Sequence, residues 1–165
     1  MSAILSIPVL SIIVVFQSAV VSRLPLNHGT ADLMLVVLVA ITLQKSVKSV
    51  WLWSIVGGLL TDFFSGLPFG LFTFCYLIAT GMAFILRERI WRFSFLMQLL
   101  VVFTGTIISH GLAVLVLFLG GAILQLNTVL QGVTLPSIIL NFMLSLPVFI
   151  ITQDIIQQLT PVEQI

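Results

Sequence analysis

The stretch Gly57-Gly-Leu-Leu-Thr-Asp62-Phe-Phe-Ser-Gly66-Leu-Pro-Phe-Gly70 places one carboxylate and four glycines in an otherwise largely apolar segment. Gly58 and Gly66 lie four residues before and after Asp62, so the three residues share one face of a helix. Small residues at this spacing let another backbone come close. Pro68 cannot continue the hydrogen-bond ladder of a helix. The stretch therefore predicts two helices joined by a tight turn, with Asp62 held inside the hairpin.

The turn itself is predicted by the residues around Pro68. Gly66 and Gly70 flank this proline, as suits a tight connection, and Ser65 is expected to cap the helix that follows. Bulky side chains in place of Gly66 or Gly70 are expected to disrupt the hairpin or the docking of a partner, because they would push closely packed helices apart.

Composition shows which solvent surrounds this hairpin. Sixty per cent of the 165 residues are hydrophobic and only 7% are charged, against roughly 25% charged in a soluble domain. Six apolar runs follow one another, and about 20 apolar residues are needed to cross a bilayer. We therefore predict an all-α, polytopic membrane protein of about six transmembrane helices, with residues 1–165 as one integral membrane domain. The predicted spans are Ala3–Val21, Ala31–Leu43, Val50–Phe64, Pro68–Leu86, Phe93–Leu124 and Leu135–Thr152.

Basic residues predict the orientation of the bundle. Lys45 and Lys48 follow the second run, and three arginines lie between positions 87 and 92 after the fourth run. On the other side only Arg23 is found. Because Lys and Arg accumulate in cytoplasmic loops, both termini are expected in the cytoplasm. A loop is expected at residues 125–132, and a short polar tail after Thr152.

Three further polar residues at membrane depth are candidates for function, since ionisable groups are costly there. Asp32 opens the second run, either as an exposed carboxylate favoured by the helix dipole or as a functional group. His110 is either a neutral imidazole bonded to a neighbour or a partner for Asp62. Asn141 could join the same network. A carboxylate as deep as Asp62 should find a donor or take up a proton, unless a helix end leaves it solvated. We expect His110 or Asn141 to be the partner that holds Asp62 in a structural role.

Several classes of function have no support in the sequence. The net charge of +1 gives no basic patch for nucleic acid. With one cysteine and two histidines, the chain has too few ligands for a Cys/His zinc site and cannot form a disulfide framework. No hydrolase, metalloprotease or phosphate-binding motif is present, so we expect no enzymatic activity, no cofactor and no metal.

The motif from Gly58 to Leu71 resembles the signature of the MreD family, the rod shape-determining membrane proteins of bacteria. That family has a glycine, a carboxylate four residues on, and two more glycines at four-residue intervals. The order of other features is also similar. They are Leu24-Pro25 after the first run, Asp32 at the start of the second, the basic segment 87–92 after the fourth and Pro147 in the last. One position departs from the family, which usually has proline where this chain has Ala31.

The resemblance implies a non-enzymatic scaffold of the cell-wall elongation complex in the bacterial cytoplasmic membrane. Its implied partners are MreC, the glycan polymerase RodA with its class B transpeptidase, MreB filaments and membrane lipid. A different class stays open, the substrate-binding S component of an energy-coupling-factor vitamin transporter, which is also a small six-helix bundle. The candidate residues for partner or ligand binding are Gly58, Asp62, Ser65, Gly66, Pro68, Gly70, Asp32, His110 and Asn141.

Overall fold

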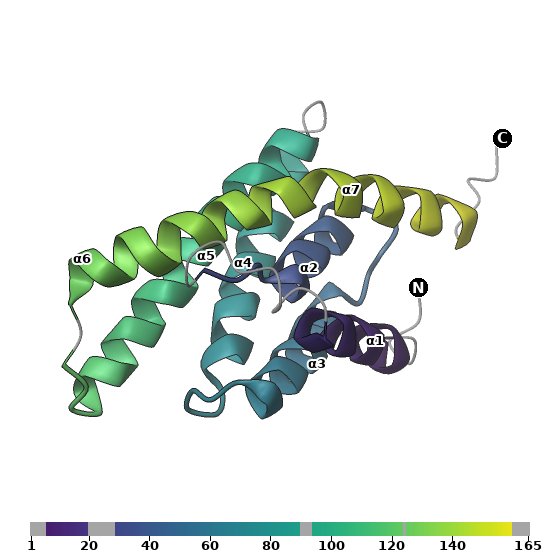
Figure 1. Cartoon of the computed structure of the whole chain (residues 1–165). Helices are drawn as coiled ribbons and strands as arrows, with labels where there is room; N and C mark the ends of the chain where they lie inside the picture. Colours follow the sequence, from purple (N-terminus) through teal and green to yellow (C-terminus); the bar gives the residue numbers. More distant parts are fainter. Residues whose placement is uncertain (1–5, 20–28, 90–93, 124, 160–165) are drawn as a thin grey trace, which may run out of the picture.

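The computed structural model describes residues 6–19, 29–89, 94–123 and 125–159, and every regular element in them is helical (Figure 1). Five helices are followed by a sixth continuous rod, in which α6 leads through one π-helical turn into α7. The bounds are α1 Ser6–Ala19, α2 Leu33–Leu43, α3 Val50–Phe64, α4 Leu71–Arg89, α5 Ser94–Leu119, α6 Leu126–Val129, the π-turn Leu130–Thr134 and α7 Leu135–Leu159. The predicted all-α fold of six helices is confirmed.

Three of the helices are long and apolar enough to cross a membrane: α4, α5 and the last rod. The other three are shorter, with 14 residues in α1, 11 in α2 and 15 in α3. At a rise of about 1.5 Å per residue, α2 is only about 16 Å long, roughly half of a bilayer core. A membrane location is thus plausible, while six complete crossings stay a prediction.

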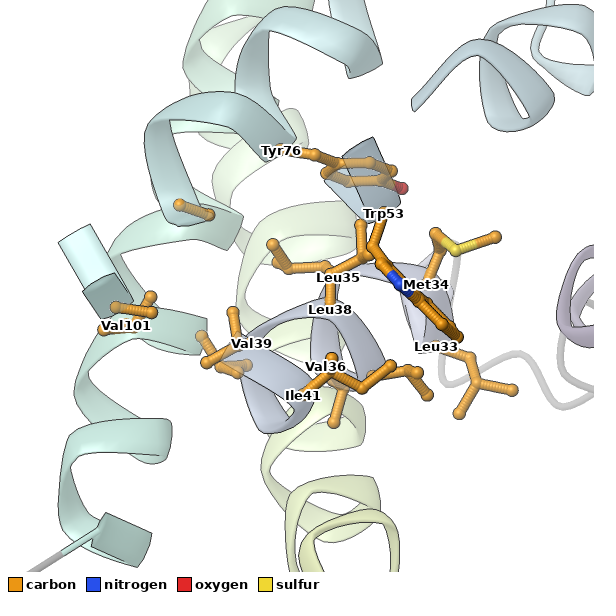
Figure 2. Close-up of a cluster of buried hydrophobic side chains, with 14 of the residues drawn as sticks. Leu33, Met34, Leu35, Val36, Leu38, Val39, Ile41, Trp53, Tyr76 and Val101 are labelled. Carbon is orange, nitrogen blue, oxygen red and sulfur yellow. The ribbon is translucent and has the colours of Figure 1, made fainter. Parts of the chain in front are cut away.

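Helix α2 forms the centre of the molecule. All eleven of its residues are buried, and it contacts α1, α3, α4, α5 and α7. Figure 2 shows its leucines and valines surrounded by Trp53 of α3, Tyr76 of α4 and Val101 of α5. A helix that is apolar on all sides belongs in a protein core or in lipid, and here the neighbouring helices cover it. Residues 30–32, which are not helical, lead into it.

Several helix ends differ from the predicted spans. Helix α2 begins at Leu33 rather than Ala31, and α4 runs from Leu71 to Arg89 rather than from Pro68 to Leu86. The loop expected at residues 125–132 is helical from Leu126, and α7 continues past Thr152 to Leu159. Both predictions were wrong because hydropathy marks the apolar part of a helix, whereas exposed polar residues also join its hydrogen-bond ladder. Helix α5 ends at Leu119, where Gly121 turns the chain with a φ of 86°. The predicted bounds of α3 are confirmed at both ends, as is the position of Pro147 inside α7.

Candidate functional site

The hairpin of α3 and α4 is closed by the Asp62 carboxylate. Its Oδ1 accepts a hydrogen bond from the backbone N–H of Phe72 at 2.8 Å. Its Oδ2 accepts from the backbone N–H of Thr73 at 3.1 Å and from the Thr73 hydroxyl at 2.6 Å. The first N–H groups of a helix have no partner within that helix, and a carboxylate suits this end of the dipole. Asp62 of α3 therefore caps α4 from outside, and we call this contact the Asp62 clasp.

A close backbone contact lies one helical turn before the clasp. A Cβ atom added to Gly58 would collide with the Cα of Thr73 and lie 2.9 Å from its backbone nitrogen. The two helices thus touch at Gly58 without an intervening side chain. The prediction of a tightly packed hairpin with Asp62 held inside it is confirmed.

The tip of the hairpin is built differently from the prediction. Ser65 ends α3, because its N–H donates to the Thr61 carbonyl at 2.9 Å and its hydroxyl donates to the Asp62 carbonyl at 3.2 Å. The prediction that Ser65 caps α4 was therefore wrong. Asp62 itself supplies the bonds that a capping serine would make. The carbonyl of Pro68 accepts from Leu71 N at 3.3 Å and closes the turn.

The two glycines of the tip have open surroundings. A Cβ atom at Gly66 or at Gly70 would meet nothing within 4 Å, so close packing at these positions was a wrong prediction. Gly66 is exposed, and the close contact between the two helices lies at Gly58 instead. Gly70 has a φ of 96°, which favours glycine for its backbone conformation.

A second polar cluster lies where α2 begins. Asp32 Oδ1 accepts from Leu35 N at 3.0 Å, and the Tyr76 hydroxyl donates to the two carboxylate oxygens at 2.8 and 2.9 Å. Asn141 Oδ1 accepts from Asp32 N at 2.7 Å, and Asn141 Nδ2 donates to Thr106 Oγ1 at 2.8 Å. The cluster joins α2, α4, α5 and α7. Asp32 is thus a helix cap as one alternative predicted, but it lies inside the bundle rather than on an exposed end.

His110 and Asn141 do not contact Asp62, so the predicted partners of that carboxylate were wrong. The donors of the clasp come from its own hairpin, ten and eleven residues along the chain. His110 Nδ1 lies 3.1 Å from Thr134 Oγ1, which agrees with the alternative of an imidazole bonded to a neighbour. Asn141 belongs to the Asp32 cluster.

Sequence reasoning missed several polar residues that these clusters use. Tyr76 is the only tyrosine of the chain, and its place within an apolar run was a signal that its hydroxyl needs a buried partner. Gln17 of α1 accepts from Met34 N at 2.9 Å and so bonds a second N–H of the first turn of α2. Thr73 had no distinguishing signal, because its role depends on the helix start that follows the turn.

A cavity of about 340 Å³ adjoins the Asp32 cluster. Its wall contains residues from α1, the segment before α2, the hairpin, α5, α6 and the π-turn. The lining residues are Gln17, Thr30, Ala31, Asp32, Leu67, Phe72, Thr106, Ser109, His110, Ala113, Val114, Leu117, Val129 and Val133. Among the described residues no three His, Cys, Asp or Glu side chains come together as a metal site would need.

Comparison of the chain with protein-family models, with curated proteins and with solved structures finds no match. The likeness to the MreD family therefore rests on the residues of the hairpin motif and on the order of features along the chain.

Proposed function

We propose that this chain is a non-enzymatic scaffold of the bacterial cell-wall elongation complex. In this proposal it crosses the cytoplasmic membrane six times, with both termini inside, and holds an MreC-type protein beside RodA, its class B transpeptidase and MreB filaments. The observation that carries the proposal is the hairpin of α3 and α4. The stretch that resembles the family's signature is also the stretch that the Asp62 clasp and the Gly58 contact fasten together.

The fastened hairpin leaves apolar surface for a partner. Phe63, Phe64 and Phe69 are 74%, 68% and 62% exposed, and the rings of Phe63 and Phe69 stack edge to face at 5.2 Å. An apolar groove of about 210 Å³ lies beside the tip, between the hairpin and α5. It is lined by Pro68, Phe69, Leu71, Phe74, Leu112 and Val116. Apolar side chains of a partner helix would fit such a surface.

The space beside Gly58, by contrast, is already occupied by Thr73 of the same chain. The open small residue of the motif is Gly66, which is exposed and has free space around it. We therefore assign partner contact to the tip from Gly66 to Phe69, and an internal role to Gly58.

The proposed orientation is supported by a contact at the other end of the hairpin. Arg87 Nη1, near the end of α4, donates to the carbonyls of Thr42 at 3.0 Å and Val47 at 3.5 Å. The loop that contains Lys45 and Lys48 therefore adjoins the basic end of α4. Both basic regions can then face the cytoplasm together, as the positive-inside rule requires.

Replacement of Gly66 by leucine tests the assignment of the tip. Because nothing lies within 4 Å of the added Cβ atom, the Gly66→Leu variant should fold and reach normal membrane abundance. It should nevertheless lose most of the partner in a pull-down, since the bulky side chain would stand in the contact. Gly111→Leu is a matched control, because Gly111 of α5 is equally open. Normal partner recovery with Gly66→Leu, or loss only with Gly111→Leu, would contradict docking at the tip.

A transporter S component is the second candidate, and the cavity beside Asp32 favours it. Such a subunit binds a small molecule in its bundle and pairs with ATPase subunits. Co-purification distinguishes the two classes, because an ATPase pair would accompany a transporter subunit and wall-elongation proteins would accompany a scaffold.

A further inference from the structure

The cavity beside Asp32 has the size and lining of a small-molecule site. Its volume of about 340 Å³ lies within the range of roughly 300–1,000 Å³ that is common for ligand pockets. Apolar side chains such as Phe72, Leu117 and Val133 cover much of the wall, and a few polar groups converge between them. A mostly apolar molecule with one polar end would match this lining.

Asp32 gives the cavity its charge. Among the described residues that line the cavity, Asp32 is the only Asp, Glu, Lys or Arg. Its hydrogen bonds come from Leu35 N and the neutral Tyr76 hydroxyl, and the described residues contain no ion pair to it. A charge removed from water is costly unless a counter-charge or a metal accompanies it. The cavity therefore favours a positively charged group next to this carboxylate.

Other polar groups of the wall are suited to orienting a ligand. The Ser109 hydroxyl is buried, lines the cavity and interacts with the Cys75 thiol. His110 stands one residue further on α5, bonded to Thr134 through Nδ1. The Ser109 hydroxyl oxygen can accept a hydrogen bond from a ligand, while the Asp32 carboxylate compensates the positive charge of that ligand.

We propose that this cavity binds a small organic cation, an apolar amine whose ammonium group lies against the Asp32 carboxylate. Binding of this kind goes beyond scaffolding and does not depend on it. The hairpin tip would contact protein partners, while the cavity would hold the amine.

Charge-selective labelling of the cavity wall tests the sign of its potential. Ala113 lines the cavity, and Cys75 is the only native cysteine, so Cys75→Ala with Ala113→Cys leaves one thiol there. The full chain in lipid nanodiscs is treated with cationic and anionic methanethiosulfonates of similar size. A carboxylate in the wall of the same cavity should favour the cationic reagent by roughly tenfold. The Cys75→Ala chain with Asn127→Cys in place of Ala113→Cys has its one thiol at an exposed position. It gives the reference ratio of the labelling rates of the two reagents.

The contribution of Asp32 is isolated by two variants. Asp32→Asn should return the ratio at position 113 to the reference value, whereas Asp154→Asn, an exposed change elsewhere, should not. Tyr76→Phe keeps the carboxylate and should keep the preference for the cationic reagent. This variant provides a second measurement if Asp32→Asn does not fold. No labelling at position 113, equal rates for the two reagents, or a preference that survives Asp32→Asn would overturn the proposal.

Protection of the same thiol tests binding itself. Tryptamine should slow labelling of Ala113→Cys by an uncharged thiol reagent at least threefold more than tryptophol, in which a hydroxyl replaces the amine. Asp32→Asn should remove this difference. Equal protection by both compounds, or protection by neither, would contradict an amine site. Neither measurement involves a wall-elongation protein. A negative result for amine binding therefore does not affect the scaffold proposal, and a negative result for the scaffold does not affect the amine-binding proposal.

Discussion

Replacement of Asp62 by leucine should unfasten the hairpin of α3 and α4. The substitution removes three hydrogen bonds, to Phe72 N, Thr73 N and Thr73 Oγ1. Hydrogen bonds between buried side chains of membrane proteins average about 0.6 kcal/mol, and those to charged groups in water-soluble proteins reach about 1.5–3 kcal/mol. With two partly buried N–H groups left unpaired, we expect Asp62→Leu to lower the free energy of unfolding by about 2–4 kcal/mol.

Asparagine at the same position should cause an intermediate loss. Its amide oxygen can accept from one backbone N–H, but its NH₂ group must then face the other, which is also a donor. The Thr73 hydroxyl can rotate and accept from this NH₂ group. We therefore expect Asp62→Asn to lower the free energy of unfolding by about 1–2 kcal/mol. This loss is smaller than that expected for leucine, but asparagine is not neutral although it has nearly the size of aspartate.

The assay is reversible unfolding of the purified chain in mixed detergent micelles, combined with a double-mutant cycle. Thr73→Val removes only the hydroxyl and should cost about 1 kcal/mol in the wild-type chain, but close to nothing in the Asp62→Leu chain. Asp154→Leu, at an exposed position of α7, serves as control and should stay within about 0.5 kcal/mol. Additive effects of Asp62→Leu and Thr73→Val, or equal losses for leucine and asparagine, would refute the reasoning.

Three further predictions follow from the hairpin and its orientation. Gly58→Ala should lower the free energy of unfolding by about 2–3 kcal/mol because its Cβ atom meets the backbone of α4. Gly66→Ala should change that free energy by less than about 0.5 kcal/mol, and similar losses in both variants would disagree with the observed contact. Gly70→Ala should cost about 1–2 kcal/mol in the same assay through its φ of 96°, and a neutral result would mean that the turn adopts another conformation. A cysteine at Asn127 should react with an impermeant thiol reagent in intact cells and one at Lys48 should not; labelling at Lys48 would reverse the proposed orientation.

The sequence predicted the parts of the fold that depend on neighbours along the chain. The bounds of α3, the turn at Pro68 and the face shared by Gly58 and Asp62 follow from apolar periodicity and glycine spacing. The partner of Asp62 did not follow, because the free N–H groups of a helix start belong to the backbone and leave no mark in residue identity.

Contacts between distant segments were beyond such reasoning. Asp32 bonds Tyr76 across 44 residues and Asn141 across 109 residues, and only the packing around α2 brings these segments together. Gly66 shows the converse error, since its spacing suggested a packed position but the turn directs it outward. The cavity likewise arises from the arrangement of six segments and has no linear motif.

Co-purification of the tagged, full-length chain in mild detergent, followed by quantitative mass spectrometry, tests the scaffold proposal most directly. The account predicts stoichiometric recovery of a bitopic MreC-type protein, together with RodA and its transpeptidase, and loss of these proteins with Gly66→Leu but not with Gly111→Leu. Recovery of an ATPase pair with no wall-elongation protein would contradict it.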